Sequence, residues 1–443
     1  MVFNIVLGRE EKDKKKFGID ATIFLGKHYV KMGQTTSLSQ PVYLDVNKSH
    51  VVFVCGKRGT GKSYSLGVIA EGIADLPERF NKSLTVLIFD TMGIYWTMKY
   101  PNHEDESLLK KWDLKGKGMD ININTPVGFF EKFKAEGIPA DLPFALNPSE
   151  LFPEDWNLTF DLDRNDPIAV FIERIILILK EKKDRFGIED IIKEIRETEF
   201  DEQVKLAAEN RFISVNEWGL FSIEATPITD ILVPGKINVI DLSSYSLLPN
   251  GWKIKQLVTG LVCNAVFRER MKLRKEEEFK AISRATHFIS EEPSSDLKAP
   301  LVWVLIDEAH EFLPLKGTTA STAALKTLLR EGRQPGISLV LATQQPGKIH
   351  TDAMTQSDVI LAHRLTAKID TDALGALMQS YLRAGLDKEV NILPKVPGAC
   401  IAVDDVNERL YPMRVRPRFS WHGGSAPRIL HSVKENPSEK KVF

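Results

Sequence analysis

The stretch VVFVCGKRGTGKS, from Val51 to Ser63, is a short apolar run that ends in a glycine-rich loop. It satisfies every required position of the pattern G-x-x-x-x-G-K-[ST], in which glycines let backbone N–H groups approach a polyphosphate closely. The following residues, Tyr64 to Leu76, carry apolar side chains at helical spacing, so the positive end of a helix dipole would face the phosphates. Strand, loop and helix together predict an α/β protein that binds a nucleoside triphosphate.

The residue types in this loop predict how the phosphates are held. Lys62 is expected to reach the outer phosphates as a point charge, and Ser63 to bind the Mg²⁺ ion that bridges them. The guanine motif N-K-x-D is missing, because NKSH at Asn47 and NKSL at Asn81 lack its aspartate, so the expected nucleotide is ATP. The predicted nucleotide contacts of the loop are Gly56, Lys57, Arg58, Gly59, Thr60, Gly61, Lys62, Ser63 and Tyr64.

A second block, LVWVLIDEAHEFLP, starts with a buried-strand pattern over Leu301–Ile306 that two acids follow. The carboxyl ends of strands in an open α/β sheet carry its ligands. Asp307 is therefore expected to bind Mg²⁺, and Glu308 to polarise the attacking water. The alternative is that the two acids cap the next helix, but the P-loop in the same chain favours the hydrolytic role.

A third block, GISLVLATQQPGKI, repeats the pattern with a buried strand that Thr343 and Gln344 follow. An amide both donates and accepts, so Gln344 is expected to sense the γ-phosphate, the alternative being an ordinary polar loop residue. Between the two strands, ALKTLLREGRQPG predicts a helix with Arg330 and Arg333 near its end. Arg333 is expected to act in trans on the nucleotide of a neighbouring subunit, and the alternative is that it complements the helix dipole.

These blocks occur in one order with IFDTMGIYW, INVIDLSSYS and a closing PRFSWHGG, and from about Val51 to Gly424 the chain resembles the HerA-type ATPases of the HerA/FtsK superfamily. The resemblance implies a RecA-like P-loop NTPase core in a homohexameric ring that passes double-stranded DNA through its pore as a translocase or helicase. It also implies a partner, which is a nuclease such as NurA or a defence effector. Carried over by motif, the catalytic residues are Glu308, Gln344 and Arg333, the metal ligands are Ser63 and Asp307, and Asp90 joins the nucleotide contacts.

Two departures from the family pattern affect the expected details. Relatives commonly read D-P-x-G-E-Y where this chain has DTMGIY, from Asp90 to Tyr95, so an acidic position is lost. Full-length members carry a β-barrel before the P-loop, and the roughly fifty residues in front of it here leave room for a reduced β element only. Ala21–Leu25 and Pro41–Asp45 are its expected strands, and GREEKDKKKFG, between Gly8 and Gly18, is expected to be a charged, exposed connection.

The part of the chain between the strand that ends at Asp90 and the next apolar strand is expected to contain a helical insertion. Pro167–Lys183, Ile188–Thr198 and Asp201–Phe212 have helical patterns, and the Asn-Asp-Pro sequence before the first suits a helix start. The predicted organisation is a β segment over 1–48, an ATPase core over 49–150 and 236–424, a helical insertion over 151–235 and a flexible tail over 425–443. The fold class is α/β with a mostly parallel sheet.

The composition is that of an ordinary globular protein, with 43% hydrophobic and 27% charged residues. The richest apolar run, from Ile168 to Leu179, is interrupted by charged residues and is too short to span a bilayer. The N-terminal residues lack the order of a signal peptide, so we expect a cytoplasmic protein. Cys55, Cys263 and Cys400 show no metal-ligand spacing and are expected to be reduced core residues.

The net charge of −1 argues against a protein that coats nucleic acid with its whole surface, so any DNA contact is expected to be local. A ring pore concentrates a few basic side chains where phosphate contacts dominate, although charge runs are usually solvated faces. Arg414, Arg416 and Arg418 are expected to bind phosphate or, as the resemblance suggests, to reach back toward a nucleotide site in the ring. The alternative is that they lie on an exposed strand face. The candidate DNA loops are Lys110–Gly118, Lys316, and Lys348 with His350.

Competing ATPase families are excluded by the same residues. The letters DEAH occur in two-lobed helicases, but the roughly 130 residues that follow Asp307 are too few for a second lobe. An ABC subunit would carry an S-G-G-Q signature ahead of these acids, and the segment before Pro300 has none. The prediction is an ATP-driven hexameric DNA translocase that works with a nuclease or defence effector. The alternative is a nucleotide-dependent assembly platform for an effector, with little DNA motor activity.

Overall fold

A single mixed sheet organises the chain. The computed structural model describes residues 3–32, 35–286, 299–365, 370, 372, 374–375 and 393–424. Its strands are β1 (Ile5–Leu7), β2 (Thr22–Met32), β3 (Thr35–Asp45), β4 (Val51–Cys55), β5 (Leu84–Asp90), β6 (Ile121–Pro126), β7 (Leu142–Phe144), β8 (Ile237–Asp241), β9 (Leu301–Ile306), β10 (Ile337–Thr343), β11 (Val359–His363), β12 (Ala399–Asp404) and β13 (Arg409–Val415). They are ordered β1-β3-β2-β13-β12-β11-β4-β10-β9-β5-β8-β6-β7 within the described residues.

The half of the sheet from β11 to β7 is parallel throughout, and this half carries the predicted sequence blocks. Its inner strands β4, β5, β8, β9 and β10 are almost continuously buried, as their mainly apolar sequences require when helices cover both faces. The strand β10 lies between β4 and β9, so the third block separates the first from the second. The fold is therefore α/β with a mostly parallel sheet, as predicted.

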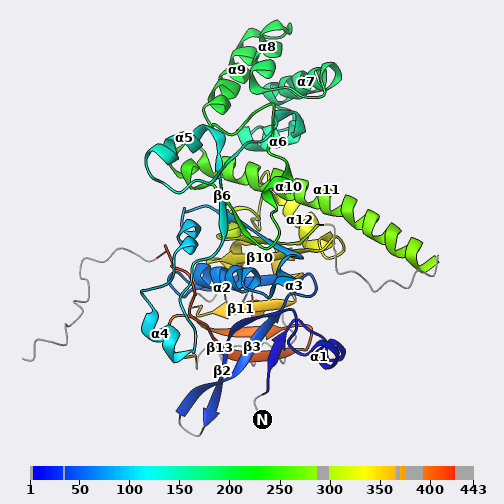
Figure 1. The fold of residues 1–443 in the computed structure, drawn as a ribbon. Helices are drawn as coiled ribbons and strands as arrows, with labels where there is room; N and C mark the ends of the chain where they lie inside the picture. The colour runs from blue at the N-terminus through cyan, green and yellow to red at the C-terminus, as the bar shows by residue number, and fades with distance from the viewer. Residues whose placement is uncertain are drawn as a thin grey trace, which may run out of the picture.

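Helices cover both faces of this sheet (Figure 1). One face packs against α2 through residues such as Leu66 and Ile69, and the other against α11 and α12 through residues such as Val258 and Leu325. The helices are α1 (Glu11–Phe17), α2 (Lys62–Ala74), α3 (Glu78–Asn81), α4 (Glu106–Lys111), α5 (Val127–Ala135), α6 (Pro153–Phe160), α7 (Pro167–Lys182), α8 (Ile188–Glu197), α9 (Glu202–Asn216), α10 (Ile228–Ile231), α11 (Gly251–Thr286), α12 (Thr322–Glu331) and α13 (Asp352–Thr355).

The helical insertion has a core of its own. The helices α6 to α9 pack around Trp156, Phe171 and Phe212, and Leu257 of α11 joins the same cluster. The three helices predicted there are present as α7, α8 and α9. They stand at the end of the molecule opposite to β2 and β3 (Figure 1).

The N-terminal strands extend the central sheet, because β2 pairs antiparallel with β13 and, on its other side, with β3. The expected strands Ala21–Leu25 and Pro41–Asp45 are the ends of β2 and β3 that adjoin the core. The prediction that Gly8–Gly18 is a charged, exposed connection is wrong at Arg9, which is 1% exposed. The charged residues Glu11–Phe17 within it have no buried member and form α1. Acids in its first turn and lysines in its last turn suit the helix dipole.

Two further predictions concern the chain ends and membranes. The tail over 425–443 lies outside the described residues. Among the residues that the structure describes, no helix is both long and apolar enough to cross a membrane.

Candidate nucleotide site

The three predicted blocks meet at one edge of the sheet. Register pairs Cys55 of β4 with Thr343 of β10, and Leu341 of β10 with Ile306 of β9. The segments that follow these parallel strands therefore leave the sheet side by side. Carboxyl edges of parallel sheets are where α/β proteins hold their ligands.

The P-loop is preformed and braced by its neighbours. The Lys57 N–H donates to the carbonyl oxygen of Arg364, just beyond β11, at 3.1 Å. Gly56 leaves no room for a side chain, because an added Cβ would lie 2.6 Å from the His363 Cβ. Gly61 has φ +108°, a conformation that favours glycine, and it begins α2 directly after the loop. The structure thus places the start of a helix at the loop, as a phosphate site requires.

Lys62 lies at the mouth of this loop. Its Nζ donates to the carbonyl oxygen of Lys57 at 3.1 Å, and the residue is 5% exposed. Burial lowers the pKa of Lys62, and the charges of Asp307 and Glu308 oppose that shift. Lys57 and Arg58, in contrast, are exposed on the outside of the loop.

Ser63 and Asp307 face each other across the site. The Ser63 hydroxyl donates to the Asp307 carboxylate, which is 9% exposed. Burial raises the pKa of Asp307, and the hydrogen bond from Ser63 opposes the shift. A hydroxyl and a carboxylate are hard oxygen donors of the kind that Mg²⁺ prefers, so the pair fits the predicted metal site.

Glu308 and Gln344 are in direct contact, with the Gln344 amide donating to the Glu308 carboxylate. Glu308 has φ +51°, a strained conformation for a residue with a side chain, and such strain is concentrated at functional sites. Its other carboxylate oxygen lies 3.6 Å from Nδ1 of His310. His310 in turn contacts the Thr343 hydroxyl at 3.0 Å, so this histidine, which sequence reasoning left without a role, links the two strand ends.

The structure does not bring Arg333 to the site of its own chain. Arg333 is exposed between α12 and β10, at the amino end of β10, whereas Gln344 follows the carboxyl end of the same strand. The neighbouring Arg330 pairs with Asp352 at 2.7 Å. Any contact of Arg333 with a nucleotide therefore requires a second subunit.

Asp90, predicted to contact the nucleotide, serves its own loop in this structure. Its carboxylate accepts hydrogen bonds from the backbone N–H groups of Gly93 and Tyr95, each at 2.8 Å. Burial and the charge of Asp241 raise the pKa of Asp90 to about 6, and these backbone contacts oppose the shift. The residue organises the segment after β5, and its contact with the nucleotide stays a prediction.

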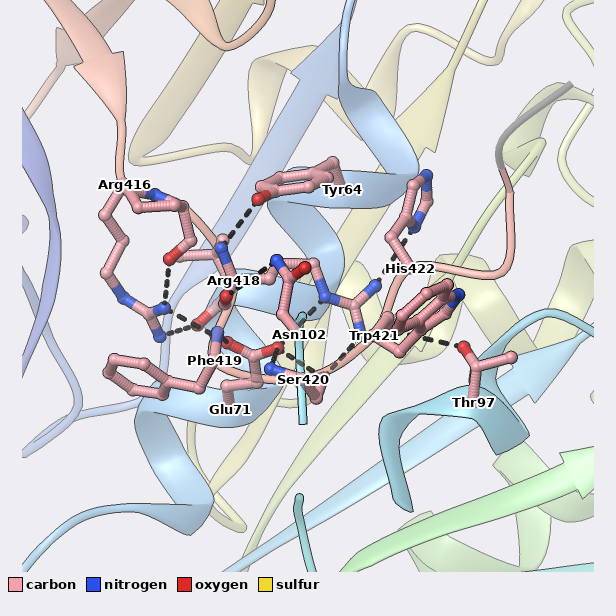
Figure 2. A network of polar contacts seen from close by, with 12 residues as sticks. Tyr64, Glu71, Thr97, Asn102, Arg416, Arg418, Phe419, Ser420, Trp421 and His422 are labelled. Carbon is pink, nitrogen blue, oxygen red and sulfur yellow. Dashed lines mark hydrogen bonds and ion pairs between the residues drawn. The ribbon is translucent and has the colours of Figure 1, made fainter. Parts of the chain in front are cut away.

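The segment after β13 forms a buried polar network on α2 (Figure 2). The carboxylate of Glu71, which is 0% exposed, pairs with Arg416 and with Arg418, each at 3.0 Å, and both arginines are 1% exposed. It also accepts from the backbone N–H groups of Phe419 at 2.9 Å and Ser420 at 3.1 Å. Burial alone would raise the pKa of Glu71, but the two arginines outweigh it and lower the pKa.

This network corrects the prediction for the arginines after β13, whereas the nucleotide contact of Tyr64 stays a prediction. Arg416 and Arg418 neither lie on an exposed strand face nor remain available for phosphate, and of the three arginines only Arg414 stays partly exposed. Tyr64, predicted to contact the nucleotide, accepts a hydrogen bond from the Arg418 N–H at 2.7 Å, as Figure 2 shows. The one sequence signal for this network is Glu71 itself, an acid among the apolar residues and glycines of Leu66–Ala74.

Two of the predicted basic loops are neighbours. The Leu315 N–H donates to the carbonyl oxygen of Lys348 at 2.8 Å, so the exposed Lys316 and Lys348 lie on adjoining segments beyond the site. In the other candidate loop, Lys110 pairs with Glu106 at 2.8 Å. The positive charges of Lys316 and Lys348 are therefore more available to an anionic ligand than that of Lys110.

The chain was compared with known proteins. Residues 24–269, more than half of the chain, match the family described as Helicase HerA, central domain. The chain is 25% identical over 363 residues to the DNA double-strand break repair helicase HerA of Pyrococcus furiosus, which covers 75% of this chain and 59% of that protein. A protein of the same name from Sulfurisphaera tokodaii is 22% identical over 357 residues, which cover 76% of this chain and 59% of that protein. The matched part is thus 59% of the length of both relatives.

Among solved structures, VirB4 of Thermoanaerobacter pseudethanolicus aligns with a TM-score of 0.49 and 13% sequence identity. This alignment covers 89% of the present chain and 96% of VirB4.

Proposed function

Because the chain belongs to the family of the HerA helicase central domain, we propose that it is an ATP-driven DNA translocase or helicase. In this proposal ATP is hydrolysed at the interfaces of a homohexameric ring. A nuclease or a defence effector is the partner, and the DNA is double-stranded. The proposal is supported by the two HerA relatives, which align with three quarters of the chain.

The observation that carries the proposal is the meeting of Lys62, Ser63, Asp307, Glu308 and Gln344 at one edge of the sheet. In the proposed site Lys62 binds the outer phosphates, and Ser63 and Asp307 hold Mg²⁺. When bound, this ion would neutralise negative charge on the phosphates. The remaining steps belong to side chains of this protein.

Glu308 is the proposed base or water-positioning group. Its carboxylate orients the attacking water and accepts its proton, a role that contributes about 10²–10⁴-fold in comparable enzymes. Gln344 lies against this carboxylate, which supports its proposed role as the group that contacts both the water and the γ-phosphate. His310 restrains Glu308 from the other side.

Arg333 is proposed to complete the site of the adjacent subunit. Its exposed position at the amino end of β10 suits a residue that projects from one subunit to the next. An arginine supplied in this way stabilises the charge that develops on the transferred phosphoryl group. The helix α12 ends at Glu331 with Gly332 as its C-cap, so Arg333 lies just beyond the helix, where its side chain is exposed.

Lys316 and Lys348 are the proposed DNA contacts, because their exposed charges lie on adjoining loops. Contacts of this kind bind phosphate without regard to sequence and weaken with salt. A translocase needs such contacts, since it must release each phosphate after binding it.

The test is steady-state ATP hydrolysis with and without linear double-stranded DNA over a range of salt, with Glu308→Gln as the blank. We expect stimulation by DNA that falls as salt rises. Replacing Lys316 and Lys348 together by alanine should abolish the stimulation and leave basal hydrolysis intact. The matched control is Lys110→Ala, which removes an exposed lysine that pairs with Glu106 and should change neither rate.

Hydrolysis that is indifferent to DNA would contradict the motor. Either this result or hydrolysis that starts only when a partner protein is added would favour the assembly platform. The lysine variants then distinguish the DNA translocase from the assembly platform, because an assembly platform does not require Lys316 or Lys348.

A further inference from the structure

His310 and Gln345 make a contact between the two segments that follow β9 and β10. The side-chain amide nitrogen of Gln345 lies 3.2 Å from Nε2 of His310. The Gln345 backbone N–H donates to the Thr343 hydroxyl at 3.0 Å, and the same hydroxyl contacts the other ring nitrogen, Nδ1, at 3.0 Å. Burial lowers the pKa of His310 and so favours the neutral ring, in which an amide that donates to Nε2 leaves the proton on Nδ1.

This contact lies at the base of the two loops that carry the exposed lysines. Gln345 precedes a single 3₁₀ turn that ends at Lys348, and its carbonyl oxygen accepts from the Lys348 N–H at 2.9 Å. The segment that contains His310 runs on to Lys316. The two segments meet again there, because the Leu315 N–H donates to the carbonyl oxygen of Lys348 at 2.8 Å. A movement of either lysine loop therefore bears directly on the contact between His310 and Gln345.

On its other side, His310 adjoins the carboxylate oxygen of Glu308 that Gln344 does not contact. This oxygen is buried and has no hydrogen-bond partner among the residues that the structure describes. It lies 3.6 Å from Nδ1 of His310, which is beyond the length of a hydrogen bond, whereas the Thr343 hydroxyl lies 3.0 Å from the same nitrogen. A small shift of the ring would exchange Thr343 for Glu308 as the partner of Nδ1. The cost of leaving a buried oxygen unpaired favours that exchange.

We propose that the contact between His310 and Gln345 couples DNA binding at the two lysine loops to Glu308. Phosphate that binds both lysines fixes the loops relative to each other, and the His310 ring then moves its Nδ1–H from Thr343 to the free oxygen of Glu308. The carboxylate is thereby held in the orientation that its role in hydrolysis requires. Coupling of two sites needs an element with two arrangements that both sites bias, and this ring supplies one. The inference rests on the proposed function, and it makes Gln345 a positioning residue that acts through His310.

The test measures steady-state ATP hydrolysis of Gln345→Ala with and without saturating linear double-stranded DNA. Affinity for the same duplex is measured by fluorescence anisotropy in the presence of a non-hydrolysable ATP analogue, and thermal unfolding reports on folding. The matched control is Gln356→Ala, which removes an exposed glutamine just beyond α13. A second variant, His310→Asn, keeps a polar group near the position of Nδ1 but loses the ring nitrogen that contacts Gln345.

We expect the ratio of the rates with and without DNA to fall about fivefold in Gln345→Ala, which corresponds to about 1 kcal/mol and to one hydrogen bond. The affinity for the duplex should equal that of the wild type, because neither lysine is removed. His310→Asn should lower the ratio by a similar factor. Combining the two changes should lower the ratio no further, since residues that act through one shared contact are not additive. Gln356→Ala should match the wild type in every measurement.

Three results would overturn the inference. One is a wild-type ratio of the two rates in Gln345→Ala. Another is an equal fall of both rates or a weaker affinity for the duplex, which would mean that Gln345 only supports packing or contacts DNA itself. The third is a double variant whose loss is the product of the two single losses. A wild-type protein whose hydrolysis DNA does not stimulate would instead refute the proposed motor, so the two failures are distinguishable.

Discussion

Replacing Glu71 by glutamine is expected to produce the largest loss of stability among single changes at the buried polar groups. Glu71 is fully buried and is the acid that faces both Arg416 and Arg418. Glutamine keeps the size of the side chain but leaves two buried guanidinium groups without their counter-charge. Removing one partner of a buried ion pair costs about 3–5 kcal/mol, because the remaining charge has no water to solvate it.

The hydrogen bonds of Glu71 place the expected value in the upper part of that range. Its carboxylate accepts from two arginines, from the N–H groups of Phe419 and Ser420, and from the Ser420 hydroxyl. All of these partners are donors, and an amide would turn an NH₂ group toward some of them. We therefore expect a loss of about 4 kcal/mol in the free energy of unfolding.

The assay is urea unfolding followed by tryptophan fluorescence, with limited trypsin digestion of the native protein to detect local release of the segment after β13. Glu78→Gln is the control, because Glu78 pairs with Lys82 on the surface, where both side chains are more than two-thirds exposed, and its loss should leave the urea midpoint unchanged. An unchanged midpoint and an unchanged digestion pattern in Glu71→Gln would refute the reasoning.

Three other outcomes are expected. Burial alone would lower the pKa of His50, but hydrogen bonds with Asp358 and Asp45 raise it to about 9. Because the pKa of His50 is higher in the folded protein, its protonation stabilises the fold fully below pH 6.5, and this contribution is lost as the pH rises through about 9. Urea unfolding should therefore show a loss of stability between these two pH values, and His50→Gln should remove this pH dependence. Glu308→Gln should keep ATP binding in a filter assay while phosphate release falls about 10²–10⁴-fold. Arg333→Ala should also lower phosphate release, and mixing it with Glu308→Gln should restore part of the activity; failure at every mixing ratio would count against a shared interface site.

The nucleotide site was largely predictable because its residues are tied to the ends of strands. Lys62 and Ser63 are adjacent in sequence, and so are Asp307 and Glu308. Apolar runs predicted the strands, and parallel strands deliver whatever follows them to one edge. Only the pairing of β10 between β4 and β9 was needed to bring Gln344 to Glu308, and the direct contact confirms that they lie together.

The network on α2 was not predictable in the same way. Arg416 and Arg418 alternate with other residues as a solvent-facing strand would, and nothing local indicates that an acid some 345 residues earlier neutralises them. Their burial depends on how the segment after β13 crosses α2. It also depends on Gly67, where a side chain would collide with the Arg418 guanidinium at 2.6 Å. Charge pattern alone could not distinguish this from a phosphate-binding surface.

By itself, the sequence determined the P-loop, the acidic strand end, the mostly parallel α/β sheet and the helical insertion, because each follows from residues that are neighbours along the chain. The tertiary structure alone decided that Asp90 organises its own loop, that Tyr64 and two arginines support α2, and that Arg333 lies away from the site of its own chain. These depend on contacts between distant segments, and a side chain's role there is set by which charges and backbone groups surround it after folding.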